Sequence, residues 1–475
     1  MLNSLRIRQF KLWRDSGPIR LAPITVICGA NSAGKSSIGQ LLLMLKQTVE
    51  SPDRTRVLHT GDSGSYVDLG IFSNLLHQHR QQQELSFELA WTPWEGEATI
   101  GDTESQQGWK GDELRFTARI RQDDPDGAIY VQGFDYTLVS SGQEQVRAGV
   151  SHTQEKAPSS KKGAYKLDLP DGTLKRRPGR PNTLSAPVRF YGFPPEVEVE
   201  YRNAAFLADL QYALEKRLQS IYYVGPLREP PKRGYGWSGE RTEHVGSRGE
   251  RAIEAILGAQ AVGRQVAQHK GDNYHGLDYR VAQWLHQMDL VDSFKVQRIA
   301  EGRKEYEVLV RTRPQGPWVH LNDVGFGVSQ VLPVIVEAFS VPRGSLILLE
   351  QPEIHLHPEV QSELGDLFVQ AIQARDRQPG VPADDRDVQF LVETHSEHLV
   401  RRLQRRIAEG ELAQDDVALY FCQTNQGNTA RMEELHVDRF GNITNWPENF
   451  FGDDMADLLA MVDAAAEAER EDRDD

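Results

Sequence analysis

Residues 29–36, Gly-Ala-Asn-Ser-Ala-Gly-Lys-Ser, have the spacing of a phosphate-binding loop. An apolar run at 24–28 precedes them, and apolar residues recur at helical spacing over 36–49. The pattern predicts a strand, a glycine loop and a helix, so that backbone N–H groups at the helix N-terminus can surround a phosphate. We therefore expect a P-loop that binds ATP together with Mg²⁺, rather than a tight glycine turn without a ligand.

The residues of this loop have separate expected roles. Gly29 and Gly34 let the backbone bend around the phosphate, while Lys35 reaches the β- and γ-phosphates and Ser36 ligates Mg²⁺. The predicted nucleotide-binding residues are Gly29, Asn31, Ser32, Ala33, Gly34, Lys35, Ser36 and Ser37.

A second apolar run, at 345–349, ends in the acid Glu350. A buried strand that ends in a carboxylate can present it to a metal-bound water beside the P-loop. Such a strand is common in α/β proteins, but here Gln351-Pro352-Glu353 and then Ile-His-Leu-His-Pro at 354–358 follow it. We expect Glu350 to hold Mg²⁺ through water, together with Ser36.

Two further segments carry residues that suit a phosphate site. His395 lies three positions after the last residue of the apolar run at 390–392. It could hydrogen-bond a γ-phosphate or an attacking water. Residues 323–330 lead into an apolar helix with Gly325, Gly327, Ser329 and Gln330, and a glycine-rich helix start favours an anion. One nucleotide needs one P-loop, so this second surface makes sense if it closes over ATP held by another subunit. The alternative is an ordinary glycine-capped helix.

Composition limits the compartment and the ligands. The 475 residues carry 54 basic and 69 acidic side chains, a net charge of −15, with acids concentrated in the tail at 467–475. General binding of polyanions is therefore disfavoured, and nucleic acid would need a local basic surface. The candidate clusters are Lys175-Arg176-Arg177 with Arg180, Arg228 with Lys232 and Arg233, and Arg401-Arg402 with Arg405-Arg406. Each is more simply a solvated face of a loop or helix.

Two cysteines and the lack of a long apolar stretch point to a reducing cytoplasm and to no membrane partner. Strand patterns recur between 85 and 139, and helical patterns occur at 201–220 and 250–290. From residue 294 onward strand and helix patterns alternate, with apolar strands expected at 345–349 and 388–393 and helices at 358–375 and 396–409. The 227–250 segment, rich in Gly, Pro and charge, is expected to be a functional or mobile loop. This alternation predicts an α/β fold in which both ends of the chain build one sheet.

The order of these motifs resembles the ABC-type ATPase heads of the SMC, Rad50 and RecF group, and most closely the ATPases related to the overcoming-lysogenization-defect (OLD) proteins. The resemblance rests on residues 29–37, 323–330, 348–358 and 393–396, with support from 5–13, 223–228 and 437–447. It implies an ABC-type P-loop head with a mixed sheet, an inserted α+β region and a small C-terminal cap. The expected divisions are 1–50 and 321–425 for the two parts of the head, 51–200 for a β-rich part with an insertion, 201–320 for a helical partner region, and 426–475 for the cap with its acidic tail.

The resemblance also implies roles for single residues. Glu350 is the Walker B acid, His395 is the switch histidine, and Gly325, Gly327, Ser329 and Gln330 form a signature contributed in trans, so that ATP is held between two heads. The family's Q-loop glutamine has no clear counterpart among the glutamines at 78–83.

One position departs from the family pattern. The residue after the Walker B acid is usually a water-activating glutamate, whereas here it is Gln351, and an amide cannot act as a general base. Either Glu353 or His395 takes that role, or hydrolysis is slow and ATP binding itself holds a state. We favour slow hydrolysis, with low basal turnover and tight ATP-dependent association.

A second departure concerns the C-terminal region. About 80 residues follow His395, fewer than a Toprim nuclease domain needs, and Asp453, Asp454 and Asp463 fall in a helical pattern. We therefore expect an ATPase that is not itself a nuclease.

By family analogy, the expected function is an ATP-dependent sensor or scaffold for a separate effector, which we expect to be a nuclease, in prokaryotic anti-phage defence, working as a dimer or higher oligomer. The alternatives are a DNA-binding repair ATPase of the RecF or SMC type and an OLD-like nuclease subunit. Salt-sensitive DNA binding would favour the repair ATPase.

Overall fold

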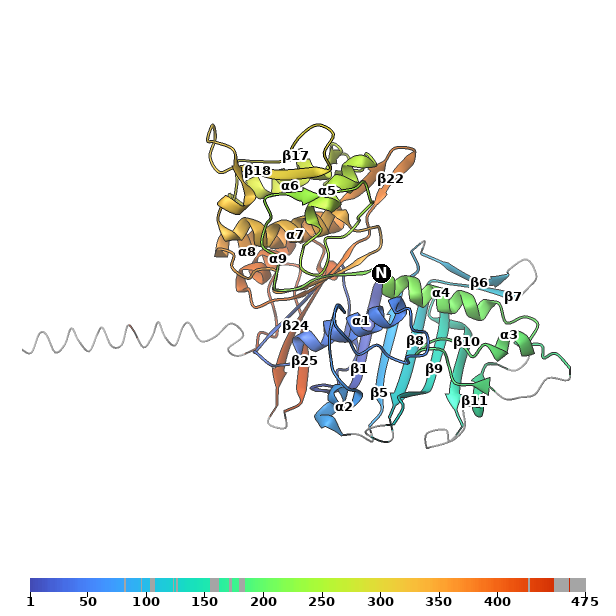
Figure 1. The fold of residues 1–475 in the computed structure, drawn as a ribbon. Coiled ribbons are helices and arrows are strands. Elements are labelled where there is room, and N and C mark those ends of the chain that lie inside the picture. Colours follow the sequence, from blue (N-terminus) through green and yellow to red (C-terminus); the bar gives the residue numbers. More distant parts are fainter. Residues whose placement is uncertain are drawn as a thin grey trace, which may run out of the picture.

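The computed structural model describes residues 1–80, 83–94, 96–102, 107–122, 124, 127–153, 162–170, 173–178, 184–425, 428–447 and 461. The acidic tail at 467–475, Asp453, Asp454, Asp463, Arg180 and most of the expected cap lie outside these residues. Figure 1 shows two lobes, with α5 to α9 in one lobe and α1, α4 and a large antiparallel sheet in the other.

A mostly parallel sheet joins the two lobes. Its order is β13 (Ile221–Val224), β20 (Leu346–Glu350), β23 (Gln389–Glu393), β4 (Ile24–Gly29), β24 (Val417–Thr424) and β25 (Ala430–Leu435). All neighbours pair in parallel except β24 and β25, which are antiparallel. Both faces of this sheet are covered, which explains why β20 and β23 are continuous apolar runs rather than alternating ones. Strands from the two ends of the chain are adjacent here, as the sequence predicts.

On one face of the parallel sheet lie α1 (Lys35–Glu50) and the antiparallel sheet. The order of that sheet is β12 (Leu184–Ser185), β11 (Lys162–Asp168), β10 (Gln143–His152), β9 (Tyr130–Ser140), β8 (Glu113–Arg121), β5 (Leu85–Trp91), β1 (Leu2–Phe10) and β2 (Trp13–Asp15), and β3 (Ile19–Arg20) also pairs with β1. Residues 41–45 of α1 are all fully buried. A helix that is apolar on every side suits this position between two sheets.

The other face of the parallel sheet carries a helical layer. It consists of α5 (Ala252–Ala261), α6 (Leu277–Gln287), α7 (Phe326–Ser340), α8 (Pro358–Gln373) and α9 (Glu397–Ala408). Ile347 and Leu349 of β20 and Phe390 of β23 pack into this core, while Leu348 and Leu391 belong to the core on the α1 side. Successive side chains of each strand thus enter opposite layers.

Small sheets and short helices complete the fold. One sheet contains β14 (Tyr235–Gly236), β17 (Ser293–Arg298), β18 (Glu305–Arg311) and β19 (Val319–His320), and another contains β15 (Gln265–Ala267), β16 (His275–Gly276), β21 (Arg375–Gln378) and β22 (Val381–Asp385). The hairpin of β6 (Ala98–Asp102) and β7 (Gln107–Gly111) contacts α4 (Phe206–Gln219). The remaining short helices are α2 (Phe72–Leu75), α3 (Glu196–Glu200), η1 (His77–His79), η2 (Leu321–Asp323) and η3 (Gln414–Asp416).

The expected α/β fold class with a mixed sheet is confirmed. The middle of the chain also contributes strands to the large sheets, because β5 pairs with β1, and β13, from the region expected to be helical at 201–320, is the edge strand of the parallel sheet. Within 250–290, the helices α5 and α6 are separated by β15 and β16.

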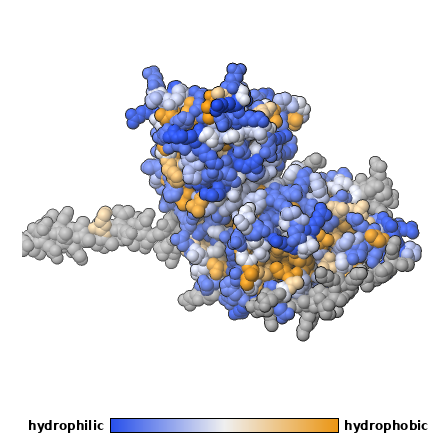
Figure 2. All heavy atoms as spheres, viewed as in Figure 1, coloured by the Kyte–Doolittle hydropathy of each residue, from blue (hydrophilic) through white to orange (hydrophobic). Residues whose placement is uncertain are grey.

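The face in Figure 2 is mainly hydrophilic, with apolar residues gathered chiefly on the lower lobe. Among the residues that the structure describes, no helix has the length and apolar character to cross a membrane.

Candidate nucleotide site

The P-loop connects β4 to α1 and has the backbone shape that its glycines predict. Gly29 has φ +136° and Gly34 has φ +89°, which strain a residue with a side chain. A Cβ on Gly29 would lie 2.0 Å from the carbonyl oxygen of Cys422 on β24, and one on Gly34 would lie 3.2 Å from the Cβ of Ala430. The loop is therefore held against the neighbouring strands, and glycine is required at both positions.

The charged and hydroxyl groups of the loop already have protein partners. Lys35 Nζ donates to the carbonyl oxygens of Gly29 and Ala30, at 3.0 and 2.7 Å. Ser36 Oγ donates to Glu393 Oε1 at 2.8 Å. The ammonium group thus lies over the loop, where a phosphate held by the backbone N–H groups would meet it.

A cavity of about 450 Å³ opens at the loop. Its lining residues are Lys11, Leu12, Asn31, Ser32, Ala33, Gly34, Lys35, Ser36, Ser37, Gln40, Gln351, Glu393 and His395. The size suits a small-molecule ligand. All predicted nucleotide-binding residues except Gly29 line the cavity. The carbonyl oxygen of Gly29 accepts a hydrogen bond from Lys35, which does line it.

Several residues at this cavity had no role from the sequence. Trp13 is fully buried, and its Nε1 donates to Ser37 Oγ at 2.8 Å, which ties β2 to the first turn of α1. Lys11, in the turn between β1 and β2, donates from Nζ to Gln40. These contacts form because β1 and β2 lie beside the P-loop. Local patterns in the sequence do not predict that placement.

Two carboxylates end neighbouring strands at the edge of the cavity. Glu350 and Glu393 are register partners at the ends of β20 and β23. Burial, followed by the charge of Glu393, raises the pKa of Glu350 to about 7, while a hydrogen bond with Tyr223 opposes the shift. Burial also raises the pKa of Glu393, and the hydrogen bond from Ser36 lowers it. Burial is the main cause of both shifts, with a smaller contribution from the charge of Glu393 at Glu350 and from the charge of Glu353 at Glu393.

The other predicted catalytic residues lie in different surroundings. Gln351 lines the cavity at φ +46°, and its N–H donates to the carbonyl oxygen of Glu393 at 2.8 Å. Glu353 is 8% exposed and accepts a hydrogen bond from the backbone N–H of His395 at 2.7 Å. His395 lines the cavity, and burial, followed by the charge of Lys35, lowers its pKa. His395 therefore lines the cavity as a neutral imidazole. Glu353 does not line the cavity and instead hydrogen-bonds the backbone just after β23.

The described residues fit a nucleotide with Mg²⁺. The loop offers backbone N–H groups and Lys35 to the phosphates, and the Ser36 hydroxyl lies beside carboxylate oxygens, which are the ligands that Mg²⁺ prefers. When bound, Mg²⁺ would offset the negative charge of the phosphates. The residues predicted from the sequence to hold it are Ser36 and, through water, Glu350.

The predicted signature forms the start of α7. Gly325 and Phe326 are exposed, and the Phe326 ring contacts His355 edge-on at 5.3 Å. Ser329 and Gln330 are 6% and 1% exposed, so their side chains face the interior. Residues 323–330, all described, do not line the P-loop cavity of the same chain. Within 325–330, the exposed part is therefore Gly325 with Phe326, and Gly327 is half-buried.

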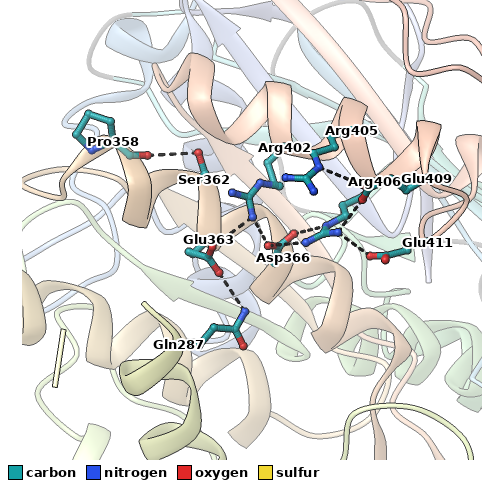
Figure 3. Close-up of polar contacts among 10 residues, drawn as sticks. All are labelled: Gln287, Pro358, Ser362, Glu363, Asp366, Arg402, Arg405, Arg406, Glu409 and Glu411. Carbon is teal, nitrogen blue, oxygen red and sulfur yellow. Dashed lines mark hydrogen bonds and ion pairs between the residues drawn. The ribbon is translucent and has the colours of Figure 1, made fainter. Parts of the chain in front are cut away.

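The proposed basic surfaces are largely paired within the chain. Arg402 and Arg406 on α9 converge on Asp366 of α8, and Figure 3 shows this network. Arg401 forms an ion pair with Glu397 of α9, and Arg405 with Glu409, the residue directly after α9. Of the second cluster, Arg228 is 5% exposed, Lys232 pairs with Glu229 at 2.7 Å and Arg233 pairs with Asp323 at 2.8 Å. The residues at 175–177 are exposed.

Comparisons with solved structures return SMC heads. An SMC head bound to the C-terminal winged-helix domain of ScpA is 11% identical, with 92% of this chain and 98% of that chain covered and a TM-score of 0.44. An SMC head domain from Thermotoga maritima is 11% identical, with 92% and 99% covered and a TM-score of 0.39. An SMC head with an extended coiled coil, from Pyrococcus furiosus and bound to the C-terminal domain of ScpA, is 10% identical, with 92% and 96% covered and a TM-score of 0.43.

In the parallel sheet, β23 lies between the P-loop strand β4 and the Glu350 strand β20, and α7 belongs to the helical layer. No curated protein matches the chain. A family model described as "Protein of unknown function (DUF3696)" matches residues 412–461. A second family model, described as "AAA domain, putative AbiEii toxin, Type IV TA system", matches residues 24–401, from the P-loop strand past His395. The chain belongs to this AAA-domain family.

Proposed function

We propose that this chain binds ATP and Mg²⁺ at the P-loop and that two or more heads associate around the bound nucleotide. The observation that carries the proposal is the separation of the two phosphate-binding surfaces. The P-loop cavity is lined by residues of the β1–β2 turn, the P-loop, α1 and the strand ends, whereas the partly exposed backbone at 325–327 lies elsewhere on the same chain. A second head would bring its 325–327 backbone and helix dipole to the γ-phosphate.

Slow hydrolysis is part of this proposal. Gln351 lies at the cavity in the position where relatives carry a water-activating glutamate, and its amide cannot accept the proton. Glu353 is held by the His395 N–H and is not among the lining residues, which disfavours it as the base. ATP binding then holds the associated state, and hydrolysis releases it at a low rate.

Sedimentation velocity tests the assembly. The chain with ATP and Mg²⁺ should sediment faster than the chain without nucleotide. The variant Lys35→Ala should sediment alike in both conditions. Association that does not depend on ATP would count against the proposal.

We further propose that the assembled ATPase acts as a sensor or scaffold for a separate effector, a nuclease, in anti-phage defence, and that it is an OLD-like ATPase. The family description, which refers to a toxin of a type IV toxin–antitoxin system, supports a role in conflict with phage or host. Copurification with the product of a neighbouring gene, and loss of phage protection in Lys35→Ala, would test it. DNA cleavage by the purified chain alone would instead favour the OLD-like nuclease alternative.

Direct DNA binding, as in repair ATPases, is disfavoured by the internal pairing of the α9 and 228–233 arginines. A DNA titration at several salt concentrations distinguishes the two functions. Strong binding that weakens steeply with salt would support the repair ATPase.

A further inference from the structure

We propose that Glu393, at the end of β23, holds the nucleotide's Mg²⁺ together with Ser36, in the place that the sequence pattern gives to Glu350. The inference rests on the proposed function, because it requires that the P-loop binds ATP. It concerns a residue to which neither the motif order nor the family resemblance gives a role.

The order of strands puts Glu393 closer to the P-loop than Glu350. β23 pairs directly with the P-loop strand β4, and β20 lies one strand further away. Neighbouring strands are about 4.8 Å apart, so the backbone of β20 is roughly 10 Å from that of β4. Glu350 and Glu393 are opposite each other in the register of the two strands. The difference in their distance from the loop therefore comes from the strand order alone, and Glu393 is the nearer residue.

The contacts of the two carboxylates agree with this order. Ser36 Oγ donates to Glu393 Oε1 at 2.8 Å, and Glu393 lines the cavity. Glu350 has a hydrogen bond with Tyr223 of β13, on the side away from β4, and is not among the lining residues. The P-loop hydroxyl that ligates Mg²⁺ is therefore already beside the carboxylate of Glu393.

The chemistry of Mg²⁺ suits this pair. The ion binds protein through one or two carboxylates and shares its remaining positions with phosphates and water. A hydroxyl and a carboxylate oxygen in hydrogen-bond contact can both turn to one cation bound between them. A cation there would also reduce the repulsion between Glu393 and Glu350. Glu350 would then act one step further out, on a water of the ion or on Glu393 itself.

The test compares ATP affinity with and without the metal. A fluorescent ATP analogue is titrated against the full chain in EDTA and then in Mg²⁺, and the ratio of the two dissociation constants measures the contribution of the metal. Glu393→Gln keeps the shape of the side chain but removes its charge. We expect its affinity in EDTA to equal or exceed that of the unmodified chain, and its Mg²⁺ ratio to fall by about tenfold or more. Glu350→Gln should lower the ratio less.

Two results would overturn the inference. One is a Mg²⁺ ratio in Glu393→Gln equal to that of the unmodified chain. The other is an equal loss of affinity in EDTA and in Mg²⁺, which would mean that Glu393 only shapes the loop. If Glu393→Gln does not fold, Glu393→Asp replaces it, and a full Mg²⁺ ratio in that shortened variant would contradict direct ligation.

Glu397→Gln is the matched control, because Glu397 begins the following helix and does not line the cavity. Its Mg²⁺ ratio should be unchanged. Binding of Mn²⁺ to the nucleotide complex, followed by electron paramagnetic resonance, gives a second readout that should weaken in Glu393→Gln. If the unmodified chain fails to bind ATP, the proposed function fails. If it binds ATP and only the Glu393 results disagree, the function stands and this inference fails.

Discussion

The hydroxyl of Ser36 donates a hydrogen bond to Glu393 at 2.8 Å, although 357 positions of sequence separate the two residues. The contact exists because β4 and β23 are neighbours in the parallel sheet. It places a carboxylate from the C-terminal part of the chain directly against the N-terminal P-loop. The candidate site is therefore built from both ends of the chain and depends on the complete sheet.

Lys35→Ala should abolish ATP binding while leaving the fold intact. The Lys35 ammonium lies over the loop on the Gly29 and Ala30 carbonyls, so its removal takes away the cation that faces the phosphates. We expect isothermal titration calorimetry to show a loss of affinity of about a hundredfold or more, in line with a charge-assisted contact. Lys110→Ala removes an exposed lysine paired with Glu97 and should bind normally. Near-normal ATP affinity in Lys35→Ala would remove the basis of the site assignment.

Gln351→Glu should speed ATP hydrolysis. The side chain lines the cavity, so a carboxylate at this position can take a proton from an attacking water. General-base catalysis contributes about 10²–10⁴-fold, and the crowding with Glu350 and Glu393 raises the pKa of the new acid, which strengthens it as a base while its pKa stays below the working pH. We expect turnover to rise at least about tenfold in a phosphate-release assay. A fast basal rate in the unmodified chain, or no gain in the variant, would contradict slow hydrolysis by this cause.

Asp366→Asn should destabilise the helical layer. The Asp366 carboxylate is 9% exposed and accepts from Arg402 and, at 2.6 and 3.0 Å, from Arg406 (Figure 3). Its removal leaves Arg402 with Glu363 alone, and leaves Arg406 with Glu409 and Glu411, as counter-charges. The expected cost is therefore at most roughly 3 kcal/mol. Chemical denaturation measures this loss. Glu409→Gln, which removes an exposed partner of the same Arg406, should cost much less. Equal effects would mean that the Asp366 network does not stabilise the fold.

Glu337→Gln should make stability less dependent on pH. Glu337 of α7 is 1% exposed, and burial raises its pKa from 4.5 to about 8, while the Val245 N–H hydrogen bond opposes the shift. Between pH 4.5 and 8 the folded state keeps a proton that the unfolded state releases, so unfolding free energy falls as pH rises. Glutamine has no such cost and can still accept from Val245. The difference in unfolding free energy between the variant and the unmodified chain should therefore grow in the variant's favour from pH 5 to pH 8, by up to about 1.4 kcal/mol per pH unit.

Urea denaturation at several pH values measures this difference. Glu88→Gln, at a partly exposed carboxylate paired with Arg8, is the control and should show no such trend. A difference between Glu337→Gln and the unmodified chain that stays constant with pH would show that Glu337 is ionised in the folded state.

Local patterns in the sequence predict much of the fold. The apolar runs at 345–349 and 388–393 are β20 and β23 within one residue at either end, and the helices expected at 358–375 and 396–409 are α8 and α9 within two. The two helices are long and strongly periodic, and the two strands are continuous apolar runs that each end in a glutamate. For the same reason the P-loop and its flanking strand and helix lie where the sequence places them.

Contacts between distant segments could not be predicted in the same way. The hydrogen bonds between Ser36 and Glu393 and between Trp13 and Ser37 are examples. Both follow from the strand order, which the local sequence does not encode. The arginines at 401–406 look like a cationic surface along the chain, but their partner Asp366 lies on another helix. The interior direction of Gln330 depends on how α7 packs, which the glycine pattern around it does not specify.

The central claim is that one head's P-loop and another head's 325–327 backbone complete one ATP site. Gly327→Asp tests it well, because a Cβ there would meet only two leucine side-chain atoms, at 3.9 Å, and an acid in the first turn suits a helix. The new charge would repel a γ-phosphate held by the partner. Gly327→Ala is the steric control and should associate normally. Gly327→Asp alone should bind ATP but remain monomeric.

The most direct measurement mixes Gly327→Asp with Lys35→Ala and follows sedimentation with ATP and Mg²⁺. Neither variant should associate alone, because the first lacks a usable signature and the second lacks a P-loop that binds ATP. In the mixture, the intact P-loop of one meets the intact signature of the other, so we predict ATP-dependent hetero-association, weaker than that of the unmodified chain. A mixture that stays monomeric while the unmodified chain associates, or Gly327→Asp that associates alone, would contradict the account.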